Sequence, residues 1–261
     1  MASALVDLFP TEFDTYYEGF LGGGSVALEV TRRHPGVSVS VNDAWFPLVT
    51  FWRVLRDSPD ELVETLLHLK ASTSSHTARG LVDECRGMLS TMDTTTVDNA
   101  AAFYTMNKCG YSGLASGYSQ QAWRQNFTER SIGNLPLTSQ DIQGWQITNG
   151  DYRGTFADVV YLDPPYNIRS ALYGDRGDMH EGFDHDEFVD YSERIPSDTM
   201  ISYNMEMSVA FSDAWTPMLF DKTYTMVSRG RYMKDQRKRK ELVLTNYPIP
   251  PRDEDLSFYM L

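Results

Sequence analysis

The chain has 261 residues, of which 41% are hydrophobic and 23% are charged. This composition is that of a globular protein and not of an intrinsically disordered one. The length suits one large α/β domain or a core domain that carries a smaller insertion. The formal net charge of −13 repels nucleic acid as a whole, so a nucleic-acid partner requires a locally basic surface.

The first elements predict the opening of a doubly wound α/β domain. Thr15–Phe20 reads as a short aromatic strand that runs into a glycine-rich turn, and Val26–Val30 has the periodicity of a helix. Val37–Val41 (VSVSV) alternates like a second strand and is followed by Asn42-Asp43. The order strand, glycine turn, helix, strand and acidic residue is typical of this fold class.

The next hundred residues carry helical signals instead. A helix is expected from Asp60 to Leu67 behind the start signal Ser58-Pro59, and amphipathic segments follow at Ala78–Leu89 and Val97–Met106. Asn107–Arg130 is polar, aromatic and rich in turns. We therefore predict a helical insertion over residues 46–143, between a core formed by residues 1–45 and 144–261.

Strand signals resume after the predicted insertion. Short apolar segments predict strands at Trp145–Thr148, Asp158–Leu162, Thr199–Tyr203, Tyr224–Ser228 and Glu241–Thr245. The polar stretch Asn167–Asp184 is long enough to serve as a lid over a site, and loops of this length are also found as plain surface.

The glycine turn spans Phe20 to Ser25 (FLGGGS). Glycine tolerates positive φ and has no side chain, so the backbone can approach a ligand closely at the start of a helix, although a tight turn that binds nothing has the same composition. Asp43, after the next strand, could accept hydrogen bonds from ribose hydroxyls. The dinucleotide spacing G-x-G-x-x-G is missing, which disfavours NAD and points to a nucleoside without a pyrophosphate, such as S-adenosylmethionine.

The strongest chemical signal is Asp163-Pro164-Pro165-Tyr166. It follows a predicted buried strand, so we expect it at the carboxyl end of the sheet, where open α/β folds bind ligands. The two prolines remove two N–H donors and leave carbonyl and carboxylate oxygens as acceptors. Such acceptors suit an exocyclic amino group, which would bond to Asp163 and to the carbonyl oxygen of Pro164, while Tyr166 offers a flat face to a base. A purely structural proline turn is the alternative.

The motifs and their order resemble the Dam-type (D12 class, alpha group) family of DNA adenine-N6 methyltransferases. The resemblance rests on FLGGGS, on Asn42-Asp43, on the long helical segment and on Tyr161–Tyr166 (YLDPPY). It covers most of the chain, because Phe103–Gly113 and Glu241–Asn246 (ELVLTN) are also similar to family segments. The segments Tyr16–Val30 and Leu172–His185 look most like enzymes encoded by large DNA viruses of algae.

The resemblance implies a site-specific enzyme, of the kind found in restriction-modification systems. It would transfer a methyl group from S-adenosyl-L-methionine to N6 of an adenine flipped out of duplex DNA, without a metal. The implied fold is a doubly wound Rossmann-like methyltransferase sheet (residues 1–45 and 144–261, the catalytic domain) with a helical target-recognition insertion (46–143). The resemblance also implies which residues bind each ligand. The methionine end of the cofactor would be bound by Phe20, Leu21, Gly22, Gly23, Gly24 and Ser25, its ribose by Asp43, and its adenine by Asp151 and Tyr152. The target base would be bound by Asp163, Pro164, Pro165 and Tyr166, and Asp163 would also lie near the methionyl group.

Three features depart from the family pattern. The family usually begins with a W-x-G-x-K-like segment whose lysine contacts the cofactor, whereas Met1–Asp14 contains neither lysine nor glycine. Gly19 and Lys108 stand where proline and arginine are common. These departures and the acidic balance leave open a non-catalytic DNA-binding relative with weakened cofactor binding. An RNA adenine methyltransferase is a further alternative, because similar proline turns occur in enzymes that act on RNA.

Candidate DNA contacts come from the predicted insertion and from a basic run near the C-terminus. In the insertion we single out Lys108, Arg124 and Arg130, with Gln120, Gln121 and Asn126 as further residue types that read base edges. The basic run contains a single acidic residue, Asp235. Its basic residues are Arg229, Arg231, Lys234, Arg237, Lys238, Arg239 and Lys240. A solvated hairpin that keeps a terminal strand soluble is the alternative reading of this run.

Other site classes find no support in the sequence. Cys85 and Cys109 have no metal-ligand spacing and do not suggest a disulfide framework, which fits a reducing compartment. No segment has the length of a membrane span, and the N-terminus lacks the features of a signal peptide. We therefore expect a soluble intracellular protein, in the cytoplasm or nucleus of a host if viral. The oligomeric state is not indicated.

Overall fold

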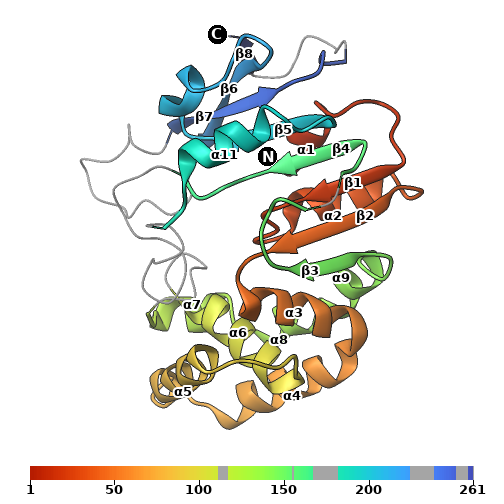
Figure 1. The fold of residues 1–261 in the computed structure, drawn as a ribbon. Helices are drawn as coiled ribbons and strands as arrows, with labels where there is room; N and C mark the ends of the chain where they lie inside the picture. Colours follow the sequence, from red (N-terminus) through yellow and green to blue (C-terminus); the bar gives the residue numbers. More distant parts are fainter. Residues whose placement is uncertain (111–116, 155, 167–181, 224–237, 251–257, 261) are drawn as a thin grey trace. The chain divides into compact units, whose positions relative to one another are not determined.

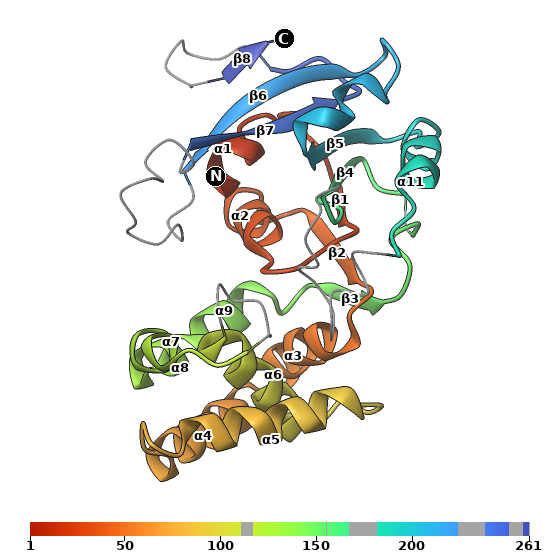
Figure 2. The same cartoon turned by 90° about the vertical axis from the view of Figure 1, so that its left-hand side faces the viewer.

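The computed structural model describes residues 1–110, 117–154, 156–166, 182–223, 238–250 and 258–260 (Figures 1 and 2). These residues divide into two compact units. The sheet unit contains residues 1–41, 152–166 and the described parts of 182–260, and the helical unit contains residues 42–151 except for 111–116. The predicted strand Tyr224–Ser228, most of the predicted loop Asn167–Asp184 and the basic residues Arg229, Arg231, Lys234 and Arg237 lie outside the described residues.

The sheet unit contains most of the strands and a few short helices. Its strands are β1 (Thr15–Glu18), β2 (Ser38–Asp43, whose last two residues belong to the helical unit), β4 (Val159–Leu162), β5 (Asp198–Tyr203), β6 (Thr216–Thr223), β7 (Lys238–Thr245) and β8 (Phe258–Met260). Its helices are α1 (Ala2–Val6), α2 (Ser25–Arg33), α11 (His185–Ser192) and the 3-10 helix η2 (Met205–Val209).

The helical unit contains the strand β3 (Gln146–Asn149) and a series of helices. These are α3 (Phe46–Asp57), α4 (Pro59–Ser72), α5 (Ala78–Ser90), α6 (Val97–Cys109), α7 (Gln120–Gln125), α8 (Glu129–Gly133) and α9 (Leu135–Asp141). No strand is described between residues 44 and 145, as the helical signals of this stretch predict.

The described strands form one sheet in the order β3-β2-β1-β4-β5-β7-β6-β8. The pairs β1–β2, β1–β4 and β4–β5 are parallel, whereas β7 is antiparallel to both β5 and β6. The order 3-2-1-4-5 with parallel central strands is that of a doubly wound α/β sheet, so the predicted fold class is confirmed. A C-terminal antiparallel hairpin follows the parallel strands.

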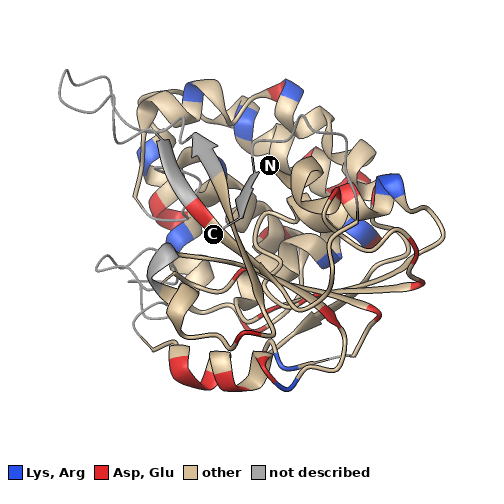
Figure 3. Cartoon of the chain, turned by 90° about the horizontal axis from the view of Figure 1, so that it is seen from above, with Lys and Arg blue, Asp and Glu red and all other residues tan. Residues whose placement is uncertain are grey.

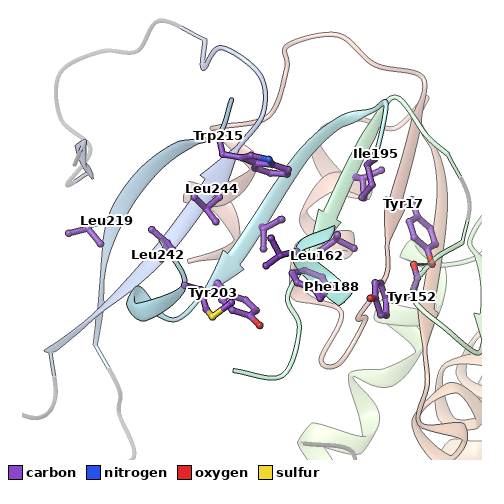
Figure 4. Close-up of a cluster of buried hydrophobic side chains, with 14 residues drawn as sticks. Tyr17, Tyr152, Leu162, Phe188, Ile195, Tyr203, Trp215, Leu219, Leu242 and Leu244 are labelled. Carbon is purple, nitrogen blue, oxygen red and sulfur yellow. Dashed lines mark hydrogen bonds between the residues drawn. The ribbon is translucent and has the colours of Figure 1, made fainter. Parts of the chain in front are cut away.

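Helices cover both faces of this sheet (Figure 2). Side chains alternate between faces along a strand, so Tyr16 and Tyr17 point in opposite directions. Tyr16 packs against Phe9, which follows α1. Tyr17 belongs instead to a large buried cluster that includes Phe188 of α11 and Leu162 of β4 (Figure 4). Because α1 also packs against α2, the first crossover helix α2 and the later helix α11 lie on opposite faces of the sheet (Figure 2).

Asp158 fixes the start of β1 beside the start of β4. Its Oδ2 atom accepts hydrogen bonds from the Asp14 and Thr15 backbone N–H groups and from the Thr15 hydroxyl, at 2.8–3.0 Å. Thr15 Oγ1 in turn accepts from the Asp158 N–H. The hydrogen bonds to the Thr15 hydroxyl and to the two backbone groups lower the pKa of Asp158. These hydrogen bonds fix the register between β1 and β4, in which Glu18 lies opposite Tyr161.

The helical unit is built around α6, which contacts α3, α4, α5 and α7. The sequence predicts an amphipathic helix at Val97–Met106, and the helix is confirmed. Its amphipathic character is not, because every residue from Ala100 to Met106 is buried. Three consecutive alanines let the neighbouring helices approach α6 from several sides, and a helix that is apolar all round is typical of a central position.

Candidate active site

The carboxyl ends of β1 and β4 form the switch point of the sheet. The two strands are parallel neighbours, and the chain leaves β1 towards β2 on one side and β4 towards β5 on the other. The Gly19 N–H, just past β1, still bonds to the Tyr161 carbonyl oxygen at 3.2 Å. Open α/β sheets bind their ligands at such a point. The glycine turn and Asp163–Tyr166 both begin here, on adjacent strands of the sheet unit.

The glycine turn joins β1 to α2 with two residues in the left-handed region. Gly22 and Gly24 have φ of 47° and 64°, which disfavours any other residue at these two positions. The Gly24 N–H closes the turn on the Leu21 carbonyl oxygen at 2.8 Å, and Leu21 is buried. Gly23 has no positive φ, and a Cβ placed there would meet nothing within 4 Å. Neither conformation nor packing within the chain therefore requires glycine at position 23.

Phe20 and Tyr152 are brought together beside this turn. Their rings stack with centroids 5.0 Å apart and planes inclined by 23°. Tyr152 is buried, its carbonyl oxygen accepts the Tyr17 hydroxyl at 3.0 Å, and its ring also contacts Phe188. Gly19 lies against the same residue, because a Cβ there would be 3.3 Å from the Tyr152 Cβ. Two residues predicted to contact a cofactor thus form one aromatic pair.

Asp43 and Asp151 both belong to the helical unit, where Asn42 links them. The Asn42 Nδ2 group donates to the carbonyl oxygens of Gly150 and Asp151 at 3.0 and 3.2 Å. The Asp43 carboxylate accepts the Trp45 N–H at 2.9 Å, which fixes its direction at the end of β2. Asp43 is half-buried and Asp151 is exposed.

The segment Asp163–Tyr166 leaves β4 with Pro164 buried and its other residues half-buried. The Tyr166 hydroxyl donates a hydrogen bond to Oε1 of Glu241, and its ring centroid lies 6.1 Å from that of Tyr203. Glu241 is 4% exposed. Burial, and then the nearby Asp163 carboxylate, raise the pKa of Glu241 from 4.5 to about 8.

Sequence reasoning missed Glu241 as a site residue and used it only to mark the start of a strand. The available signal was a glutamate at the start of an otherwise apolar strand, ELVLT. Because side chains alternate between the two faces of a strand, Glu241 points away from the face that carries the core residues Leu242 and Leu244. Its proximity to Tyr166 depends on the antiparallel pairing of β7 with β5, which no local pattern encodes.

The candidate DNA contacts occupy different environments. Lys108 is half-buried on α6, its Nζ lies 5.3 Å from the Tyr104 ring centroid, and burial lowers its pKa. Arg124 and Arg130 are exposed on α7 and α8. Lys238 opens β7, where its backbone pairs with Thr223. Both basic and acidic positions occur on the described helices, and α11 carries only acidic ones (Figure 3).

The described residues contain no group of three or more histidine, cysteine, aspartate or glutamate side chains placed to hold a metal ion. None of the helices in the described ranges is long and apolar enough to cross a membrane.

Comparison with known proteins agrees with the motifs. The family model for D12 class N6 adenine-specific DNA methyltransferases matches residues 1–239. The Type II methyltransferase M1.LlaDCHI of Lactococcus lactis subsp. cremoris is 23% identical over 260 residues, covering 92% of this chain and 89% of the relative. Two solved structures of the rRNA methyltransferase aviRa from Streptomyces viridochromogenes are 12% identical, with TM-scores of 0.33 and 0.35, and cover 93% of this chain and 80% of theirs. The family model, which spans most of the chain, decides the assignment: the chain belongs to the D12 class N6 adenine-specific DNA methyltransferases.

Proposed function

We propose that this adenine-specific DNA methyltransferase uses S-adenosyl-L-methionine and acts on an adenine flipped out of duplex DNA, at the carboxyl ends of β1 and β4. The observation that carries the proposal is the emergence of the glycine turn and of Asp163–Tyr166 from adjacent parallel strands. A ligand bound by the first motif would thereby lie next to a base bound by the second.

The target base would be held by acceptors and by stacking. The Asp163 carboxylate and the Pro164 carbonyl oxygen would accept the two N6 hydrogens, which directs the nitrogen lone pair towards the methyl donor. Tyr166 would stack on the base and offset part of the unstacking cost, which is on the order of a few kcal/mol. Positioning and electrostatics at N6 would supply most of the acceleration, and the N6 proton can leave after the methyl group arrives.

The cofactor would lie along the glycine turn, from Phe20 to Ser25. The turn is compatible with this placement, because Gly23 is exposed and has no side chain, so that a ligand could approach the backbone closely. When bound, S-adenosylmethionine would supply the electrophilic methyl group. Tyr152, stacked on Phe20, would contact its adenine together with Asp151, and Asp43 would accept hydrogen bonds from its ribose.

DNA recognition would belong to the helical unit and the basic run. We propose residues 46–143 as the target-recognition insertion and residues 1–45 and 144–261 as the catalytic domain. The exposed side chains Arg124 and Arg130, the half-buried Lys108 and the basic run would contact DNA. The basic run comprises Arg229, Arg231, Lys234, Arg237 and Lys238 together with Arg239 and Lys240.

Transfer of labelled methyl groups to random-sequence duplex DNA, followed by mapping of the modified adenines, tests this proposal. RNA of the same sequences serves as the second substrate, and calorimetry measures cofactor binding. We expect N6-methyladenine in the duplex, a loss of at least a hundredfold in Asp163→Ala, and no loss in Asp213→Ala, a change at an exposed position of the same unit. Labelling of RNA alone, or full activity of Asp163→Ala, would overturn the proposal. Absence of cofactor binding at millimolar concentration would indicate a non-catalytic relative.

A further inference from the structure

Glu241 is a buried carboxyl group at the edge of the sheet where the proposed site lies. β7 is antiparallel to β5 with Leu242 opposite Tyr203, so Glu241 is one position beyond the last residue of β5. Asp163 directly follows the last residue of β4, the parallel neighbour of β5. Glu241 and Asp163 therefore extend from the same edge, which is formed by the carboxyl ends of the parallel strands.

Glu241 fixes one end of the Tyr166 side chain, and an aromatic ring supports the other. The Tyr166 hydroxyl donates to Glu241 Oε1, while the Tyr166 ring lies 6.1 Å from Tyr203 at an angle of 51°. Tyr203 is itself constrained, because it stacks on Phe188 at 5.6 Å with planes 6° apart and its hydroxyl is hydrogen-bonded to His185. Tyr166 is still only half-buried, so part of its surface is accessible.

Packing does not explain a carboxyl group at position 241. Burial disfavours its charged form, and the nearby Asp163 adds like-charge repulsion, so its pKa is raised to about 8. A leucine or a glutamine would occupy similar space without this cost. Carboxyl groups held at such a cost cluster at functional sites.

We infer that Glu241 is a positioning residue that holds the Tyr166 ring, through the hydroxyl hydrogen bond, in the orientation in which it stacks on the extruded adenine. This inference rests on the proposed function, in which Tyr166 is the stacking platform. Without the hydrogen bond the ring would keep its contact with Tyr203 but could turn about its side-chain bonds, so fewer bound bases would be correctly aligned for methyl transfer.

Four variants test the inference: Glu241→Gln, Glu241→Leu, Tyr166→Phe and the double variant Tyr166→Phe/Glu241→Leu. Glutamine keeps an oxygen that can accept the tyrosine hydrogen, whereas leucine does not. Single-turnover methyl transfer is measured on a duplex that carries the mapped recognition sequence. A second duplex, with the fluorescent analogue 2-aminopurine at the target position, reports the environment of the extruded base independently of catalysis.

We expect Glu241→Leu and Tyr166→Phe each to slow methyl transfer about tenfold, which corresponds to about 1.4 kcal/mol, with unchanged affinity for the duplex. Glu241→Gln should stay within about twofold of the unmodified enzyme. The double variant should be no slower than Tyr166→Phe alone, because both changes remove the same hydrogen bond. The 2-aminopurine signal should change equally in the two slow single variants and not in Glu241→Gln.

Tyr161→Phe is the matched control, because it removes a different buried tyrosine hydroxyl, one that is hydrogen-bonded to Ser202 at 2.8 Å. Its effect should add to that of Tyr166→Phe. Additive losses for Glu241→Leu and Tyr166→Phe, or a loss in Glu241→Gln as large as in Glu241→Leu, would overturn the inference. If Glu241→Leu does not fold, the comparison of Tyr166→Phe with Glu241→Gln still decides. Failure of the unmodified enzyme to methylate duplex DNA would instead overturn the proposed function.

Discussion

Replacing Glu241 with glutamine should change how stability depends on pH. The folded-state pKa of Glu241 is raised from 4.5 to about 8, so between these values the folded protein retains a proton that the unfolded chain has released. Stability must then fall as pH rises through this window, by roughly 1.4 kcal/mol per pH unit. The cost is absent below pH 4.5, where both states are protonated, and complete above pH 8, where both are ionised.

Glutamine does not titrate, so the comparison isolates this one group. Between pH 5 and pH 7 the free energy of unfolding of the unmodified protein, minus that of Glu241→Gln, should decrease by about 3 kcal/mol. Urea unfolding at pH 5, 6, 7 and 8, followed by tryptophan fluorescence, measures this difference. Glu241→Leu should give the same slope, because leucine does not titrate either.

Asp163 provides a second check on the same reasoning. Its charge contributes to the raised pKa of Glu241, so in an Asp163→Asn background the pH dependence should end at a lower pH. A difference in unfolding free energy that stays constant from pH 5 to pH 8 would refute a buried, protonated Glu241.

Three further predictions concern packing and reactivity. Gly19→Ala should destabilise the protein by about 1–3 kcal/mol in urea unfolding, because its Cβ would lie 2.8 Å from Cδ2 of the fully buried Leu162 and 3.3 Å from the Tyr152 carbonyl oxygen. Stability equal to the unmodified protein would contradict this. Phe188→Ala should cost about 3–5 kcal/mol, since the ring is fully buried between Tyr203 and the core, and a loss below about 1 kcal/mol would show that the site collapses without penalty. Cys85 and Cys109 should resist thiol reagents in the native protein at pH 8, because burial raises their pKa to about 11 and about 12, and fast labelling without unfolding would refute their burial.

Local patterns predicted the sheet and the order of its motifs. Val37–Val41 alternates strictly, and Asp158–Leu162 is a short apolar run, so both were recognisable as strands, which the structure has at Ser38–Asp43 and Val159–Leu162. Because Asp163–Tyr166 follows a predicted buried strand, the sequence also predicted that this segment would begin at the carboxyl end of the sheet.

Long-range pairing was not predictable in the same way. β6 (Thr216–Thr223) starts beside a proline and combines apolar with charged residues, so its local pattern is weak, and its strand character comes from pairing with β7. The bond between Tyr166 and Glu241 joins residues 75 positions apart through that same arrangement. The all-round burial of α6 likewise depends on the helices that surround it and not on its own periodicity.

The side chain of Asn42 ties together the two ends of the helical unit's long segment, because it bonds to the carbonyl oxygens of Gly150 and Asp151. A segment whose two ends lie close together can be lengthened, shortened or replaced while the strands before and after it keep their positions. The reason is that loop-closure entropy increases only slowly with the length of the segment. Under the proposed role of the helices in target recognition, new sequence preferences could therefore evolve, or be grafted, between β2 and β3 without redesign of β4, the strand that precedes Asp163.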